Sequence, residues 1–208
     1  MQGTLNGISS VDVFSLLGLL HVLQQLVVGL MLGFVFQLVM SAITLAGHNV
    51  ATTMGLGFAA TADPHNGSES TTIGQIYTVI ATLYFLSVDA HLHLLGILSD
   101  SMKSIPLQQF VLDSDFFRAL VQFSGQVFVF GTLLVLPVII GLLLVNLALA
   151  VMTRAAPQLN IFSLGFPVTI IAGFVLMLLS VPVLSPLLGS FMDVTLAFMR
   201  DLSRGLDG

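Results

Sequence analysis

Residues 154–167, which read RAAPQLNIFSLGFP, interrupt the most apolar part of this chain. They lie between two runs, 119–153 and 168–192, that contain no Asp, Glu, Lys or Arg. Pro157 and Pro167 each remove a backbone donor and restrict the preceding residue, so we do not expect a continuous helix here. Broken backbone at membrane depth survives only where protein or a water-filled cavity covers it. The alternative from these residues is a surface turn between two membrane spans.

Composition is typical of a polytopic membrane protein. Hydrophobic residues make up 56% of the 208 residues, charged residues make up 7%, and the mean hydropathy is +1.07. No soluble domain of this length has that profile. The five Lys and Arg residues are too few for a phosphate-binding stripe, so nucleic-acid binding is excluded. The lack of cysteine excludes disulfides and thiolate catalysis.

Two apolar runs are longer than a membrane crossing requires. A helix through 13–46 or through 119–153 would be about 50 Å long, whereas the hydrocarbon core is about 30 Å thick. We therefore expect an all-α fold of kinked, partly irregular helical hairpins that stack against partner subunits. Gly29 and Gly33 form a Gly-x-x-x-Gly face that lets another helix backbone approach, although glycine is also simply frequent in membrane helices.

The run 73–98 has the length of one membrane span, and it contains Asp89, His91 and His93. On a helix, Asp89 and His93 share one face at a spacing of four residues, whereas His91 points to the other side. A carboxylate inside a membrane helix is a candidate proton relay. The plainer interpretation, which we favour, is an ion pair between Asp89 and His93 near a helix end. Metal-ligand spacing is absent, so no metal is expected.

Three ordered stretches resemble the FliR family of type III export-gate components, whose relatives in virulence systems include SpaR and YscT. The first is the Arg-x-x-Pro-Gln-x-Asn-Ile-Phe-x-x-Gly-Phe-Pro pattern of 154–167. The second is 47–64, which ends MGLGFAATADP. The third is LYFLSVDAH at 83–91, followed at a distance by Ser-Ile-Pro at 104–106. The resemblance begins near Val13, so we expect an N-terminal hydrophobic portion typical of the family to be absent.

The resemblance implies a structural subunit of the flagellar type III export gate, at the flagellar basal body in the bacterial inner membrane. It implies FliP and FliQ as partner subunits, FlhB as a further neighbour, and exported flagellar proteins as passing substrates. No cofactor and no catalytic residue are implied. A proton- or ion-coupled solute transporter is the alternative from another class. An enzyme has almost no support, because the chain contains neither Gly-x-Ser-x-Gly nor His-Glu-x-x-His.

The second matching stretch contains the candidate gate. Glycines give its backbone freedom, while bulky apolar side chains can fill a narrow passage and exclude water. By resemblance this part of the family forms a plug-like loop inside the channel, whereas the alternative is a frayed helix end. The gate residues are Met54, Gly55, Leu56, Gly57 and Phe58. The first stretch supplies the broken-helix signature, which consists of Pro157, Gln158, Asn160, Phe162, Gly165, Phe166 and Pro167.

Polarity divides the chain, a single membrane domain over 1–208, into spans and connections. The expected connections are a polar N-terminus at 1–12, a gate-like loop at 47–67, a polar connection at 99–118, the broken segment at 154–167 and a polar tail at 193–208.

Overall fold

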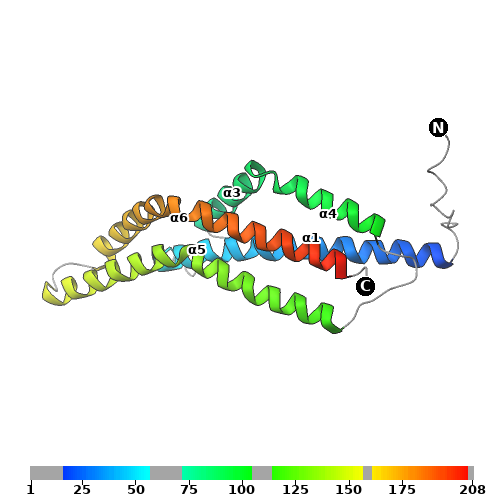
Figure 1. The fold of residues 1–208 in the computed structure, drawn as a ribbon. Helices are drawn as coiled ribbons and strands as arrows, with labels where there is room; N and C mark the ends of the chain where they lie inside the picture. The colour runs from blue at the N-terminus through cyan, green and yellow to red at the C-terminus, as the bar shows by residue number, and fades with distance from the viewer. Residues whose placement is uncertain (1–15, 57–71, 105–113, 157–160, 206–208) are drawn as a thin grey trace.

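The computed structural model describes residues 16–56, 72–104, 114–156 and 161–205 (Figure 1). These residues form helices and no strand: α1 Leu16–Thr53, α3 Thr72–Ser87, α4 Ala90–Ser104, α5 Ser114–Ala155 and α6 Ile161–Gly205. The all-α class predicted from the sequence is therefore confirmed.

Helix α1 runs through the middle of an elongated bundle (Figure 1). It packs against α3 and α5, while α6 packs against α5 and α4. The N-terminal end of α1 extends beyond the other helices, and α5 and α6 extend together beyond the opposite end of α1 (Figure 1). The two ends of α1 therefore have very different surroundings.

A seam of apolar side chains on α1 forms the centre of the core. Its residues recur every three or four positions, which is the period of one helix face. They are almost fully buried: Val28, Leu32, Val35, Val39, Ala42, Ala46 and Val50. Stacked rings join α5 to α6, with 4.1 Å between the ring centroids of Phe123 and Phe198.

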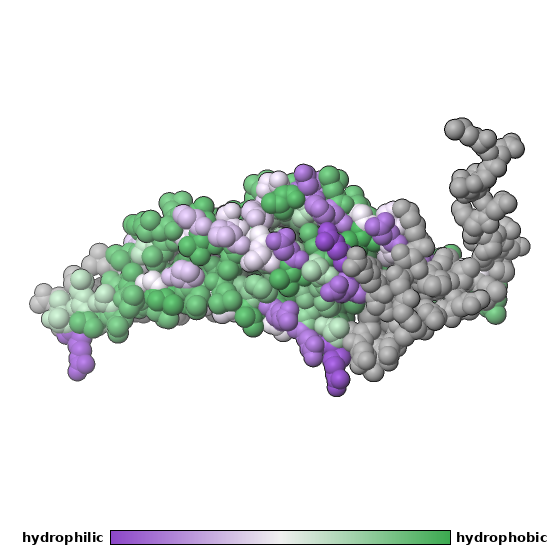
Figure 2. All heavy atoms as spheres, in the orientation of Figure 1, coloured by the Kyte–Doolittle hydropathy of each residue, from purple (hydrophilic) through white to green (hydrophobic). Residues whose placement is uncertain are grey.

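The outer surface is also apolar. Leu144 is 63% exposed and Leu178 is 72% exposed, and Figure 2 shows hydrophobic residues over much of the face in view. Within the described residues, three stretches are long and apolar enough to span a membrane: Gln25–Thr53, Arg118–Ala155 and Gly165–Leu202. The pair α3 and α4, bent by 69°, is a fourth if it counts as one broken span. The polytopic membrane prediction is thus confirmed.

Helices α5 and α6 contain 42 and 45 residues, which is more than a straight crossing needs. Fully regular helices of these lengths would measure about 63 and 68 Å. Pro137 lies inside α5, and Pro182 and Pro186 lie inside α6. Membrane helices tolerate such prolines where neighbouring helices and polar side chains satisfy the freed backbone groups.

The predicted gate-like loop at 47–67 begins too early, because α1 continues to Thr53. The Thr52 and Thr53 hydroxyls donate to the His48 and Asn49 carbonyl oxygens at 2.9 and 2.7 Å. These polar side chains bond within their own helix, so they do not interrupt it.

In two predicted polar connections, the residues that the structure describes are helical. In the 99–118 connection, α4 continues to Ser104 and α5 begins at Ser114. The tail predicted at 193–208 continues α6 as far as Gly205. Polarity in these segments marks where a long helix leaves the apolar region, and not where the helix ends.

The break expected across 154–167 is shorter than predicted. Helix α5 ends at Ala155 and α6 begins at Ile161, so the chain is not one continuous helix here. Pro167 nevertheless lies inside α6, and its expected role in fixing a non-helical segment is wrong. It is the seventh residue of α6, so its missing N–H leaves one intrahelical bond unmade, a loss that membrane helices tolerate where neighbouring groups satisfy the freed carbonyl.

Candidate functional site

The C-terminal end of α1 has the geometry of a defined helix stop. Gly55 has a φ of 89°, a left-handed conformation that glycine adopts without steric cost. The Leu56 N–H donates to the Ala51 carbonyl oxygen and the Gly55 N–H to the Thr52 carbonyl oxygen, both at 3.0 Å. This pair of bonds is the Schellman motif, which satisfies the last helical carbonyls. The chain therefore leaves α1 in a fixed direction.

Two side chains from other helices hold this end in place. The Asn146 amide on α5 donates to the Thr53 carbonyl oxygen at 3.3 Å. The Thr169 hydroxyl on α6 donates to the Met54 carbonyl oxygen at 3.0 Å. Carbonyl groups at a helix C-terminus lack partners within the helix, so these bonds satisfy groups that would otherwise be orphaned. The end of α1 is thereby tied to both α5 and α6.

Close packing reinforces these hydrogen bonds. Met54 is fully buried, and a Cβ added to Gly173 would lie 2.6 Å from the Met54 Cε atom. The Phe166 ring covers Gly55, where an added Cβ would lie 2.8 Å from a ring carbon. A side chain at Gly55 would be strained by the positive φ as well, and one at Gly173 would force the Met54 side chain to move. We call this set the α1 anchor: Met54, Gly55, Asn146, Phe166, Thr169 and Gly173.

An open pocket of ≈620 Å³ borders the α1 anchor. Its lining is mainly apolar and contains no titratable side chain: Thr52, Thr53, Met54, Gly55, Leu143, Asn146, Leu149, Gly165, Phe166 and Thr169. The described lining thus offers shape and hydrogen-bonding groups.

Comparison with known proteins gives the family. Residues 2–194 match the family model described as bacterial export proteins, family 1. The chain belongs to this family. The match begins at residue 2 and not near Val13, so the expected late start of the resemblance is corrected.

Curated relatives agree with the family match. The flagellar biosynthetic protein FliR of Buchnera aphidicola subsp. Acyrthosiphon pisum is 35% identical over 188 residues, which cover 90% of this chain and 73% of that protein. FliR of Escherichia coli is 37% identical over 178 residues, covering 86% and 68%. FliR of Bacillus subtilis is 31% identical over 182 residues, covering 86% and 70%. The resemblance to the FliR family is confirmed.

Two of the FliR-like stretches meet at the α1 anchor. Gly55 comes from the stretch at 47–64, and Phe166 comes from the stretch at 154–167. The Phe166 ring lies against the Gly55 backbone, although the two residues are 111 positions apart in the sequence.

Of the predicted gate residues, the structure describes Met54, Gly55 and Leu56. The Met54 side chain is fully buried in the core of its own chain, so it does not fill an open passage as the sequence predicted. Leu56 is partly buried against the core. Gly57 and Phe58 lie outside the described residues, and their place in a passage stays a prediction.

The residues of the broken-helix signature are likewise only partly described. Gly165 and Phe166 border the anchor pocket. Pro157, Gln158 and Asn160 lie outside the described residues, and Phe162 is in α6 with its side chain undescribed.

Asp89 lies at the bend between α3 and α4, and not within one straight span. Its φ is 54°, a left-handed conformation that Asp tolerates better than most residues. Its carbonyl oxygen accepts from the Leu92 N–H at 3.0 Å and lies 3.1 Å from the His93 Nδ1 atom. His93 thus contacts the Asp89 backbone, and the predicted ion pair between their side chains does not form in this structure.

His91 lies in the first turn of α4. Its ring centroid is 6.2 Å from that of Phe85, and its buried Nδ1 atom has no hydrogen-bond partner within the described residues. The structure does not bring His91 together with Asp89 and His93 as one cluster.

Gly29 and Gly33 face open space, since an added Cβ at either position would meet nothing within 4 Å. The close backbone approaches of α1 occur elsewhere. A Cβ at Gly47 would lie 2.7 Å from the Gly74 Cα atom, and one at Gly131 would lie 3.0 Å from the Ala42 carbonyl oxygen. Sequence reasoning missed the Gly47 contact because a lone glycine has no spacing signal.

Proposed function

We propose that this chain is a structural subunit of the flagellar type III protein export gate. In this role it helps form and seal the channel through which flagellar proteins cross the bacterial inner membrane, and it catalyses no reaction of its own. Family membership, relatives named flagellar biosynthetic protein FliR, and three candidate membrane spans support the proposal.

The α1 anchor is the structural observation that carries the sealing role. A segment that closes a passage must start from a fixed base, because a mobile base would let the seal shift under membrane potential. The anchor provides that base through two hydrogen bonds from neighbouring helices and a fully buried methionine. The segment proposed as the seal begins directly after it, at Gly57 and Phe58.

The proposed partners are FliP and FliQ subunits, with FlhB as a further neighbour and lipid around the assembly. The exposed apolar surface supports an assembled state. Leu16, Leu19 and Leu30 in the first half of α1 are 75%, 64% and 65% exposed, and Gly29 and Gly33 in the same half are uncovered. Small residues beside large apolar ones are the usual composition of a helix–helix interface in membranes.

The assembly can be tested directly. A bacterium that lacks this chain is expected to be non-motile and to secrete no flagellar proteins, and the tagged chain is expected to leave a mild-detergent extract in a larger complex with FliP and FliQ. A lone stable monomer in the extract, or normal motility without the chain, would contradict the proposal.

The seal is tested at Phe58. Phe58→Ala, or removal of 58–62 with the anchor retained, is expected to leave the complex assembled and to let small ions cross the membrane. Phe128→Ala is the matched control, because Phe128 is 56% exposed on α5 and far from the gate in sequence. Membrane conductance and growth sensitivity are the measurements. A tight membrane at normal complex yield means that another segment forms the seal.

A further inference from the structure

The exposed face of α1 changes its chemistry halfway along the helix. Residues spaced three or four positions apart share a helix face, so one face can be followed along the whole of α1. Its first half is apolar, with Leu19, Leu23, Leu26, Leu30 and Phe34. Its second half, which we call the polar stripe, contains Gln37, Ser41, Thr44, His48 and Thr52.

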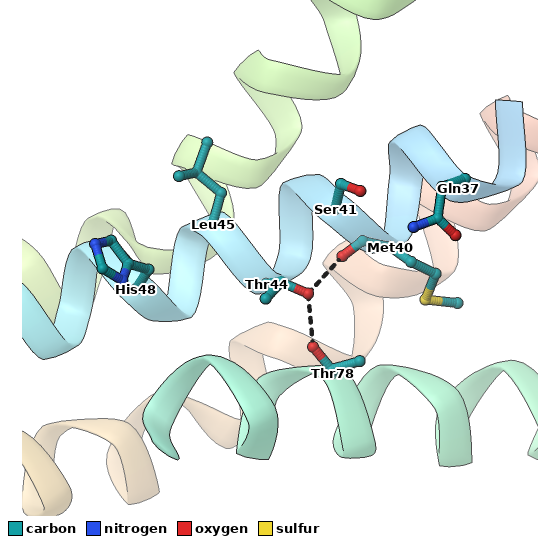
Figure 3. Close-up of a pocket in the computed structure, with 7 residues that line it drawn as sticks. All are labelled: Gln37, Met40, Ser41, Thr44, Leu45, His48 and Thr78. Atoms are coloured by element: carbon teal, nitrogen blue, oxygen red, sulfur yellow. Dashed lines mark hydrogen bonds between the residues drawn. The ribbon is translucent and has the colours of Figure 1, made fainter. Parts of the chain in front are cut away.

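The polar stripe borders an open pocket of ≈790 Å³ (Figure 3). In this view the Thr44 and Thr78 hydroxyls point toward one another, and their oxygen atoms are 2.7 Å apart. The His48 Nδ1 atom is buried and has no hydrogen-bond partner within the described residues, and the Gln37 and Ser41 side chains are exposed. The stripe therefore presents donors and acceptors to whatever fills the pocket.

Hydrocarbon is a poor occupant for this pocket. The stripe lies inside Gln25–Thr53, a candidate membrane span, and unsatisfied polar groups at membrane depth cost several kcal/mol each. Among the described residues, the lining has no Asp, Glu, Lys or Arg to hold an ion or a phosphate. Amide, hydroxyl and imidazole groups instead match the N–H and C=O groups of a polypeptide backbone.

We propose that the polar stripe is this chain's wall of the export passage and contacts the backbone of a passing polypeptide in an extended conformation. This inference rests on the proposed function. Two observations carry it: the described lining of the pocket offers amide, hydroxyl and imidazole groups beside Met40 and Leu45, and the polar stripe lies inside a candidate membrane span.

The dimensions and the bond strengths fit a sliding polypeptide. The stripe spans about 22 Å of helix, which an extended chain covers with about seven residues. Each neutral hydrogen bond contributes only about 1 kcal/mol net, so the contacts exchange readily as the polypeptide advances. These hydrogen bonds also contact the backbone of the polypeptide and not its side chains, which suits a passage for many different proteins.

Single cysteines test the proposal, since the native chain contains none. Ser41→Cys and Gln37→Cys place a thiol on the polar stripe, and Leu30→Cys and Leu83→Cys are matched controls at positions that are 65% and 62% exposed. The substrate is an exported flagellar protein that carries one cysteine and is stalled by a tightly folded domain fused to its C-terminus. Mild oxidation is expected to join the stripe cysteines to this substrate and to leave the controls unjoined.

A charged, water-soluble thiol reagent gives a second readout. It should label the stripe cysteines at least about tenfold faster than the controls, because the reactive thiolate forms in water and not in hydrocarbon. Ser41→Cys exchanges one oxygen atom for sulfur, so its folding is expected to be preserved, and restored motility verifies this.

Two results would overturn the proposal. A disulfide between Ser41→Cys and a transmembrane helix of a partner subunit would mean that a partner fills the pocket. Labelling as slow as that of the controls would mean that no water reaches it. Failure of the proposed function is a separate result, because export would then proceed in cells that lack this chain altogether.

Discussion

The two halves of α1 differ in what covers them. The C-terminal half contacts α3 at Gly47 and α5 at Ala42, and its end is held by the α1 anchor. The N-terminal half, up to Phe34, has exposed leucines and two uncovered glycines, and its first turns extend beyond the other helices (Figure 1). It still buries Val28 and Leu32 in the core, but its opposite face is free within the described part of this chain. Glycine therefore has opposite consequences in the two halves.

Gly47→Leu should have the largest effect. An added Cβ would lie 2.7 Å from the Gly74 Cα atom and 3.0 Å from the Ile73 carbonyl oxygen, so backbone must move. We expect a loss of about 3 kcal/mol in the stability of the folded chain. Thermal unfolding of the purified complex, together with its yield, measures this. An unchanged melting temperature would show that α1 and α3 do not approach so closely.

Gly33→Leu should act on assembly and not on the fold. The position is open within this chain, so we expect the stability of the chain itself to change by less than about 0.5 kcal/mol. Recovery of the complex with partner subunits should fall severalfold, because the added side chain keeps another helix backbone away. Co-purification yield is the measurement. Unchanged recovery with both Gly29 and Gly33 replaced by Leu would remove this face from the interface.

The contrast shows which features sequence patterns reveal. Long apolar runs predict helices and membrane spans because hydropathy is local. The contact between Met54 and Gly173 joins residues from α1 and α6, and no periodic signal connects them. Gly29 and Gly33 give a recognisable spacing but are uncovered, whereas the isolated Gly47 forms the tightest backbone approach of α1 to another helix. A pattern identifies a surface suited to contact, and only the fold shows where the contact is made.

Thr169→Val tests the anchored end of α1 with a smaller change. It removes the hydrogen bond to the Met54 carbonyl oxygen while keeping the side-chain volume, at a cost of about 1 kcal/mol. We expect an assembled complex that leaks small ions. Thr195→Val is the matched control, because the buried Thr195 hydroxyl donates to Phe191 within its own helix. Equal leakage from the two variants would exclude a specific role for the bond to α1.

The smallest effect is expected at the bend between α3 and α4, where α3 stops packing against α1. Helix α3 follows α1 as far as Phe36, whose ring centroid is 5.0 Å from that of Phe85, and the chain then bends by 69° around Asp89. Asp89→Asn should cost less than about 0.5 kcal/mol, because Asn adopts the left-handed conformation as readily as Asp and the backbone carbonyl still bonds to α4.

Asp89→Val is the matched contrast for this bend. A β-branched residue resists a φ of 54°, so a loss of about 1–2 kcal/mol is expected, with export reduced in proportion to the lost complex. Motility and complex yield, measured together for both variants, separate conformation from proton transfer. If Asp89→Asn abolishes export while the complex is present in normal amount, the carboxylate itself is required. Asp89 would then be a relay, and the transporter alternative would regain its main argument, because the amide preserves shape but carries no proton to transfer.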